Sequence, residues 1–471
     1  MAVRKTRMLV LEINEAEKHF LDKYVALGQL PVFEKLLKGG RFFKTEVPTE
    51  AALNSWAVWS SIYTGMPFSK HGMIGFGQIK APLSKVYLWD QFNSQGITTG
   101  VFGSMVNALL PEDPNNLFFI PGEFTNSQLS FPHQLESIQD FFRLTEKPHL
   151  KQRLGLCIKL LWRLAIDILK GLPLIIARLL FKQIFLEFKN TKLYQRTRFV
   201  LRAQLKMSIF QSLYEAYNPA FAMLHLEHIA YAQRHYWRAA EPENFQDKLG
   251  EFDEHFFGSL EARKTHEFAL KDSILESFKA VDVFLEGLLP KLDDNTLLVI
   301  ITGLGQKKRD PSNEIHKPKM HFRHIKKLLS LADVGDCEIL SQMDPSLTLN
   351  FLDSTEASLG AYRLSSLKVL GQYPLFKIEQ RENQVFLEGL LPPNIWFMGK
   401  DAWVENEINE RVFLLFDYIE MSPLKDQETS EYSREGWMLC FGDLSSLPVH
   451  TETLDILGIY PLLLTHFYGT K

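Results

Sequence analysis

The sequence contains few cysteines, and the three that it has, Cys157, Cys337 and Cys440, lie far apart among its 471 residues. Their number is odd, and their spacing matches neither a zinc motif nor the framework of a disulfide-rich domain. Free thiols of this kind are typical of proteins in reducing compartments. The scarcity of cysteine therefore predicts a cytoplasmic protein without structural disulfides.

The sequence also lacks a strong excess of either charge and any long uncharged apolar run. The formal net charge of −4 argues against nucleic acid as a partner. The apolar run at the start of the chain, Met8–Ile13, is too short for the core of a secretory signal peptide. Longer apolar runs between Lys151 and Lys206 are interrupted by charges before they reach the ~18 residues of a membrane-spanning helix. We therefore expect a cytoplasmic location, with peripheral attachment at the inner membrane face as an alternative.

Apolar segments of strand length alternate with helical patterns in both halves of the chain. Met8–Ile13 reads as a buried strand, and Ala16–Gly39 follows as a helix that Pro31 divides in two. This alternation predicts an α/β fold with a mostly parallel sheet sandwiched by helices, whose sites form at the carboxyl ends of the strands. Further strands are expected at Arg41–Val47, Thr98–Phe102 and Val299–Gly305, helices at His266–Leu289, His316–Leu331 and Glu405–Tyr418, β alternation over Leu367–Gln384, and a closing strand and helix within Tyr432–Tyr468.

Composition divides the chain into three parts. Residues 1–145 form the first part of an α/β core, and residues 213–471 form its second part with a small β insertion near 367–400. Between them, residues 146–212 are basic and apolar: Lys151–Lys206 holds thirteen Lys and Arg against two acids. This pattern favours amphipathic helices that form a cap over the site. Alternatively, basic residues such as Arg163, Lys170 and Arg178 lie on anionic lipid or hold a protein partner through 151–206.

A polar helix start marks the segment Pro48–Met73. Asn54 and Ser55 are typical N-cap residues and precede an apolar helical pattern that ends at Gly65. The start of a helix offers unpaired N–H groups and a positive dipole end, which can hold a phosphate or sulfate and ease ionisation of a hydroxyl. Ser55 is therefore either a plain helix cap or a nucleophile beside an anion site that includes Asn54.

This segment resembles the nucleophile segment of the alkaline phosphatase superfamily, in its type I phosphodiesterase/nucleotide pyrophosphatase branch. Leu88-Trp89-Asp90, Gly436–Gly442 and Ile459–Gly469 resemble later segments of the same family, in the same order. The resemblance implies an alkaline-phosphatase-like fold, with Ser55 at the position of the nucleophile. The matching positions in the first segment are Trp59, Ser61, Thr64, Gly65, His71 and Gly72.

The resemblance also implies two divalent metals, usually zinc, that activate the nucleophile and bind the transferring group. The family's first-strand Asp falls on Glu12, and its Asp and His on the next metal-binding helix fall on Ala230 and Arg234, or on Tyr231 and His235 after a shift of one. Its later Asp-His pair and last His fall on side chains that bind no zinc, so a two-metal site is not expected. Those positions are Gly303, Leu304 and Tyr432.

A rearranged site with one metal stays open as an alternative, with Glu12, His228 and His235 as ligands. His316, His321 and His324 form a second group of histidines, and both groups are more simply read as ordinary core and surface residues. The guanidinium of Arg234 matches phosphate or sulfate and would hold an anion where the family holds a metal.

Three functions follow from these observations. The first is a degenerate, pseudoenzyme-like member that has no cofactor and binds a phospho- or sulfo-bearing ligand, a glycan precursor or a protein partner. The second is an active hydrolase or transferase of phosphate or sulfate esters that uses Ser55 with zinc or another divalent metal. The third is a membrane-surface scaffold that acts through the basic segment 151–206.

Overall fold

A computed structural model of the full chain divides it into two compact units. The first consists of Met1–Ile74, Gln78–Glu314 and Glu428–Lys471, and the second of Gly75–Gly77 and Ile315–Gln427. The structure describes residues 6–73, 87–106, 114–122, 130–136, 138–140, 142, 198–245, 258–309, 319–322, 324–341, 346–390, 402–406, 410–422, 429–448 and 452–468.

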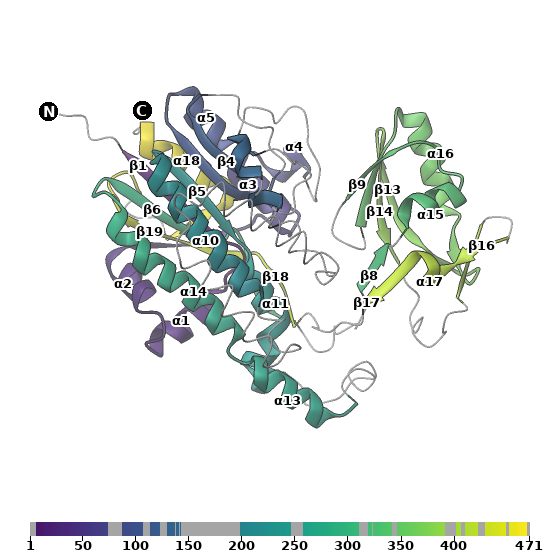
Figure 1. Ribbon diagram of the computed structural model, residues 1–471, viewed down its shortest axis with the longest axis horizontal. Coiled ribbons are helices and arrows are strands. Elements are labelled where there is room, and N and C mark those ends of the chain that lie inside the picture. Colours follow the sequence, from purple (N-terminus) through teal and green to yellow (C-terminus); the bar gives the residue numbers. More distant parts are fainter. Residues whose placement is uncertain are drawn as a thin grey trace. The chain divides into compact units, whose positions relative to one another are not determined.

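The first unit is built on an eight-stranded sheet with β1 (Arg7–Ile13) near its centre (Figure 1). β1 pairs in parallel with β5 (Phe221–Leu226) on one side and with β6 (Thr296–Ile301) on the other. β19 (Glu435–Gly442) is antiparallel to both of its neighbours, whereas β3 (Thr99–Ser104) continues the parallel pairing beside β5. The predicted α/β fold with a mostly parallel sheet is confirmed. The full strand order is β20-β2-β19-β6-β1-β5-β3-β4, with β2 at Arg41–Glu46, β4 at Asn116–Pro121 and β20 at Thr453–Asp455.

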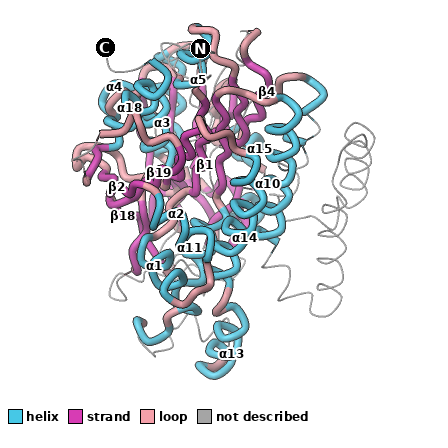
Figure 2. The backbone as a smooth tube through the Cα atoms, turned by 90° about the vertical axis from the view of Figure 1, so that its left-hand side faces the viewer, coloured by secondary structure: helices cyan, strands magenta, loops and turns pink. Residues whose placement is uncertain are grey.

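Helices cover both faces of this sheet because side chains on a strand point alternately to opposite faces (Figure 2). Leu9 and Leu11 of β1 pack in one buried cluster with α1, α2, α10, α11 and α14. Met8 and Val10 pack in a second cluster with α3, α5 and α18. The described helices of this unit are α1 (Lys18–Ala26), α2 (Pro31–Gly39), α3 (Ser55–Thr64), α4 (Phe68–His71), α5 (Leu88–Ser94), α10 (Arg198–Tyr217), α11 (His228–Ala240), α13 (Leu260–Leu270), α14 (Ser273–Leu288) and α18 (Ile456–Tyr468), with short 3-10 turns at His133–Leu135, Pro242–Asn244 and Leu289–Lys291.

Most elements expected in this unit are present near their expected bounds. Pro31 does divide the first helical pattern, because it stands at the first position of α2, where its missing N–H is harmless. The helix expected over His266–Leu289 is the last part of α13 followed by α14.

The greater part of the predicted basic insertion, residues 146–197, lies outside the described residues, together with Arg163, Lys170 and Arg178. Its described end, α10, buries Leu205, Met207 and Phe210 against the sheet. Among the helices that the structure describes, none combines the length and apolar character needed to cross a membrane.

The second unit has its own buried core and two four-stranded sheets. It contains the β structure expected over Leu367–Gln384 and begins at Ile315, well before the expected β insertion near 367–400. The strands and helices among its described residues are β8 (Lys319–Phe322), α15 (Ile325–Leu331), β9 (Glu338–Ser341), β10 (Ser346–Asn350), α16 (Ser354–Ser365), β11 (Lys368–Val369), β12 (Tyr373–Pro374), β13 (Phe376–Arg381), β14 (Gln384–Gly389), β15 (Trp403–Glu405), β16 (Arg411–Leu414), α17 (Leu415–Tyr418) and β17 (Ile419–Ser422).

Two predicted helices in the second unit were wrong. Within His316–Leu331, only α15 is helical in the described part, and β8 pairs antiparallel with β17 instead. Within Glu405–Tyr418, β15 and β16 pair antiparallel, and helix is confined to α17. In the first segment, pairing with the distant β17 overrode the local helical pattern, because strand preference depends strongly on tertiary context. In the second segment, β16 pairs with its neighbour β15, which also pairs with β11.

The close packing of β3 against β4 can be tested at Gly100. A Cβ at Gly100 would lie 2.3 Å from the ring of the fully buried Phe118. We expect Gly100→Ala to lower the free energy of unfolding by about 1–3 kcal/mol, because overpacked cores are strained. The matched control is Gly458→Ala in α18, where a Cβ meets nothing within 4 Å and the helix gains propensity. Urea unfolding measures both variants, and equal stability of the two would contradict this packing.

Candidate functional site

Ser55 is the first residue of α3, at the edge where β1 ends. Its neighbour Asn54 caps the helix by accepting a hydrogen bond from the N–H of Ala57 at 2.9 Å. The sequence therefore places the cap at Asn54 and leaves the Ser55 hydroxyl available for other partners. Ser55 is buried.

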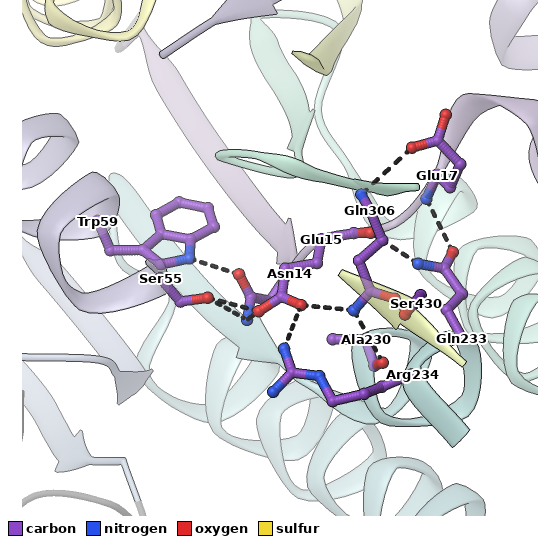
Figure 3. A network of polar contacts seen from close by, with 10 residues as sticks. All are labelled: Asn14, Glu15, Glu17, Ser55, Trp59, Ala230, Gln233, Arg234, Gln306 and Ser430. Atoms are coloured by element: carbon purple, nitrogen blue, oxygen red, sulfur yellow. Dashed lines mark hydrogen bonds and ion pairs between the residues drawn. The ribbon is translucent and has the colours of Figure 1, made fainter. Parts of the chain in front are cut away.

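The partners of Ser55 come from the turn that follows β1 (Figure 3). The Ser55 hydroxyl donates to Oε1 of Glu15 at 2.5 Å, and the amide of Asn14 donates to Ser55 Oγ at 3.3 Å. Trp59, one turn further along α3, fixes Asn14 by donating its indole N–H to Oδ1 at 2.8 Å. Glu15 adopts a left-handed backbone with φ of 57°, which a non-glycine residue rarely adopts outside turns and functional sites.

The second oxygen of Glu15 faces the other side of the site. Arg234 of α11 donates to Oε2 at 2.7 Å, and Gln306 of β7 (Gly305–Lys308) donates to the same oxygen at 2.5 Å. Gln306 also donates to the carbonyl of Ala230 at 3.0 Å and accepts from the hydroxyl of Ser430 in β18 (Ser430–Ser433) at 2.7 Å. The carboxylate thus accepts hydrogen bonds from α3, α11 and β7, and β18 holds the Gln306 donor in place.

The backbone of Glu15 is fixed as firmly as its side chain. Its N–H donates to the carbonyl of Thr302 at 3.0 Å, and its carbonyl accepts from the amide of Gln233 at 2.8 Å. The ring of Tyr432 lies under the guanidinium of Arg234, with 4.9 Å from Cζ to the ring centroid. Burial raises the pKa of Tyr432 and the charge of Glu15 adds to that rise, so its hydroxyl stays protonated at neutral pH.

Several positions that the family resemblance assigns to metal ligands therefore do surround Ser55, but with other chemistry. Arg234 and the Ala230 carbonyl contact Glu15 and Gln306, and Tyr432 packs on Arg234. Gly303 turns with φ of 73°, and a Cβ there would lie 3.0 Å from the indole of Trp59. A guanidinium, two carboxamides and a phenol do not fit a dication, because zinc takes thiolate, imidazole and carboxylate ligands.

Glu12, the position predicted for a metal ligand, lies within β1, and its carboxylate hydrogen-bonds to side chains other than Ser55. Its Oε2 accepts from the hydroxyl of Tyr63 at 2.6 Å and lies 2.7 Å from Nδ1 of His225. His225 is buried, and burial opposes its charge; the carboxylates of Glu12 and Glu227 outweigh that effect and raise its pKa. The residue that meets Ser55 is Glu15, three positions later, because the strand ends only at Ile13.

The structure also does not bring together the proposed ligands of a single metal. His228 faces the carbonyl of Ser277, with Nε2 3.1 Å from it, and His235 stacks near Tyr231 at 4.4 Å between ring centroids. Within the part of the chain that the structure describes, no group of three or more His, Cys, Asp or Glu is arranged to hold a metal ion. The side chains of His316 and His321 lie outside the described residues.

The sequence profile of the type I phosphodiesterase / nucleotide pyrophosphatase family matches residues 8–316, which is more than half of the chain. The chain belongs to this family. The match includes β1, α3, α11 and β7, which carry Glu15, Ser55, Arg234 and Gln306. The resemblance of the Pro48–Met73 segment to this branch is therefore confirmed.

Solved structures with a similar chain course show low identity. Phosphonoacetate hydrolase from Sinorhizobium meliloti 1021, in complex with phosphonoacetate, is 14% identical with a TM-score of 0.42, and the match covers 98% of this chain and 96% of that one. Human ectonucleotide pyrophosphatase / phosphodiesterase 5 is 10% identical with a TM-score of 0.39, covering 99% and 95%. These scores are too low to transfer any residue's role. A search of curated proteins finds no match.

His228 provides a pH test of the core around α11. Burial lowers its pKa to about 4, so the folded protein keeps it neutral, whereas the unfolded chain protonates it below about 6.5. Acid therefore favours the unfolded state through this residue, by about 2 kcal/mol at pH 5. We expect His228→Gln to lose less stability than the wild type between pH 7.5 and pH 5, because glutamine is not protonated in the unfolded chain. The substitution keeps an amide N–H that can donate to the carbonyl of Ser277.

Urea unfolding at the two pH values measures this difference. The exposed His133→Gln variant serves as the control and should follow the wild type. If the His228→Gln profile ran parallel to that of the wild type, His228 would be protonated in the folded protein.

Proposed function

We propose that this chain is a non-hydrolytic member of the type I phosphodiesterase family that binds a phosphate- or sulfate-bearing ligand or partner without cleaving it. The observation that carries the proposal is the ion pair of Glu15 and Arg234 directly beside the Ser55 hydroxyl. In the family's chemistry, two metals activate the nucleophile and stabilise the transferring group. Here the groups around the hydroxyl are the amide of Asn14, the carboxylate of Glu15 and, bound to that carboxylate, the guanidinium of Arg234.

The hydrogen bonds of the site support the absence of turnover. Glu15 already accepts from Ser55, Arg234 and Gln306, so its negative charge is balanced within the protein. A serine hydroxyl is a weak nucleophile unless a base or metal activates it, and this carboxylate is already paired with a guanidinium. The arrangement therefore favours a stable resting network over proton transfer.

Two features support an anionic ligand. Ser55 and the cap residue Asn54 stand at the start of a ten-residue helix, whose N–H groups and dipole favour negative charge. Arg234, whose side chain is 21% exposed, presents the group that matches phosphate or sulfate oxygens best. A glycan precursor that carries such a group would fit the same description.

The cellular setting of the proposal follows from composition. The basic segment 151–206 would bring the protein to an anionic membrane surface or to a protein partner, and the few cysteines favour the cytoplasm. Both are part of the proposal and are independent of the site.

A second candidate rests on the hydrogen bond from Ser55 to Glu15. A carboxylate that accepts the proton of a hydroxyl at 2.5 Å is the geometry of a general base and its nucleophile. In this alternative the protein is an ester hydrolase or transferase in which Glu15 activates Ser55 and Arg234 stabilises the transferring group. Glu15→Gln would then abolish activity without unfolding the protein.

Hydrolysis assays separate the two candidates. We expect purified protein to hydrolyse bis(4-nitrophenyl) phosphate and 4-nitrophenyl sulfate no faster than Ser55→Ala does, with or without added zinc or manganese. Release of 4-nitrophenol measures the rate, and a characterised family enzyme is the positive control. Turnover that disappears in both Ser55→Ala and Glu15→Gln would replace the binding proposal with the second candidate.

Binding of the anion has its own test. Phenyl phosphate titrated into the protein, observed by phosphorus NMR, should bind about 10-fold or more weakly to Arg234→Ala, because a charge-assisted hydrogen bond is worth about 1.5–3 kcal/mol. Arg238→Ala is the matched control, since Arg238 lies one turn further along α11 and pairs with Glu267. Equal affinity of the wild type and Arg234→Ala would contradict the role of Arg234.

A further inference from the structure

The Glu15 carboxylate is an acid that the fold has removed from water. Its side chain is 2% exposed, and both oxygens lie within hydrogen-bond distance of protein donors. A charge at this depth is costly unless an opposite charge and good hydrogen bonds compensate it. The only cation that the described residues pair with Glu15 is Arg234.

The guanidinium of Arg234 is held on more than one side. Its NH2 group contacts Oε2 of Glu15 at 2.7 Å, and its Cζ lies 4.9 Å from the centroid of the Tyr432 ring. The same carboxylate oxygen is anchored by Gln306, which Ser430 and the Ala230 carbonyl hold in turn. The cation and its carboxylate thus have fixed positions in a network built by the protein itself.

This network occupies the place where family chemistry needs metal ions. Ser55 donates to the oxygen of Glu15 that Arg234 does not contact, so the carboxylate joins the hydroxyl to the cation. The donor set does not suit a dication, as described above, but it does satisfy one guanidinium. The site therefore differs from the family's two-metal site in that its cation is a side chain of the protein, Arg234.

We infer that Arg234 is the resident cation of this site: it neutralises Glu15 in place of a divalent metal, and its removal opens a cation-binding cavity at Glu15. The inference rests on the proposed function, since it deepens the account of the same site. The emptied cavity takes a planar guanidinium ion as its ligand. The intact site requires no metal for its stability.

Thermal unfolding of the full-length protein tests the first half of the inference. Neither EDTA nor added zinc should shift the Tm of the wild type. Arg234→Ala should lower the Tm by roughly 5 °C, because it leaves a buried carboxylate without a counter-charge. Adding Glu15→Gln to Arg234→Ala should raise the Tm again, since the uncompensated charge is gone.

Matched controls make the coupling specific. Arg238→Ala removes another buried guanidinium from α11, and Glu15→Gln should not raise its Tm. Arg234→Lys keeps the charge without the planar fork and should fall between the wild type and Arg234→Ala. This variant also keeps the test decisive if Arg234→Ala does not fold.

Chemical rescue tests the cavity. Methylguanidinium at 20 mM should raise the Tm of Arg234→Ala by about 2 °C relative to 20 mM sodium chloride, by mass action on the folded state. It should not raise the Tm of the wild type, which lacks the cavity. It should also not raise the Tm of Arg234→Ala/Glu15→Gln, which lacks the carboxylate.

Three results would overturn the inference: a lower Tm of the wild type in EDTA, additive effects of Glu15→Gln and Arg234→Ala, or no rescue by methylguanidinium. None of these measures hydrolysis or anion binding. Turnover by the wild type would therefore count against the proposed function, whereas additive Tm effects would count against the resident cation alone.

Discussion

The charge of a carboxylate buried just after a central β-strand must be compensated by an opposite charge and by hydrogen-bond donors. The arrangement of side chains around Ser55 follows from that requirement. Glu15 leaves β1 in a left-handed turn, so its side chain reaches the start of α3 on one side and α11 on the other. Four segments from the beginning, middle and end of the sequence donate to this single group or hold its donors. The network therefore ties together parts of the first unit that are distant along the chain, at the edge of the sheet where sites of parallel folds form.

The fold was predictable from the sequence because burial on both faces of a parallel sheet requires continuous apolar strands. Met8–Ile13 and Val299–Ile301 show that pattern, and Pro31 shows where one helix must give way to another. The second unit was less predictable. Its short antiparallel strands, such as β8 with β17 and β15 with β11, depend on partners far away in sequence, and periodicity does not report those partners.

The candidate site was predicted in part. Ser55 and Arg234 were identified by position within the family pattern, and they do belong to one network. Glu12 was assigned because the family's first-strand Asp falls on it, and its side chain contacts Tyr63 and His225. Glu15, which contacts Ser55, was not identified from the sequence. Gln306 and Ser430 carried no sequence signal, because neutral side chains that complete a hydrogen-bond network are common everywhere. The polar pair Asn14-Glu15, directly after an apolar strand, was the signal available for the missing carboxylate.

The indole of Trp59 restricts which side chain position 303 can carry. The indole of Trp59 donates to Asn14 and occupies the space that a side chain at Gly303 would enter, with 3.0 Å between the added Cβ and the ring. An aspartate introduced at Gly303, where the family pattern has one, would meet that ring and strain a backbone that favours glycine. A side chain at Gly303 would therefore require the indole of Trp59 to move, and with it the hydrogen bond that holds Asn14 beside Ser55.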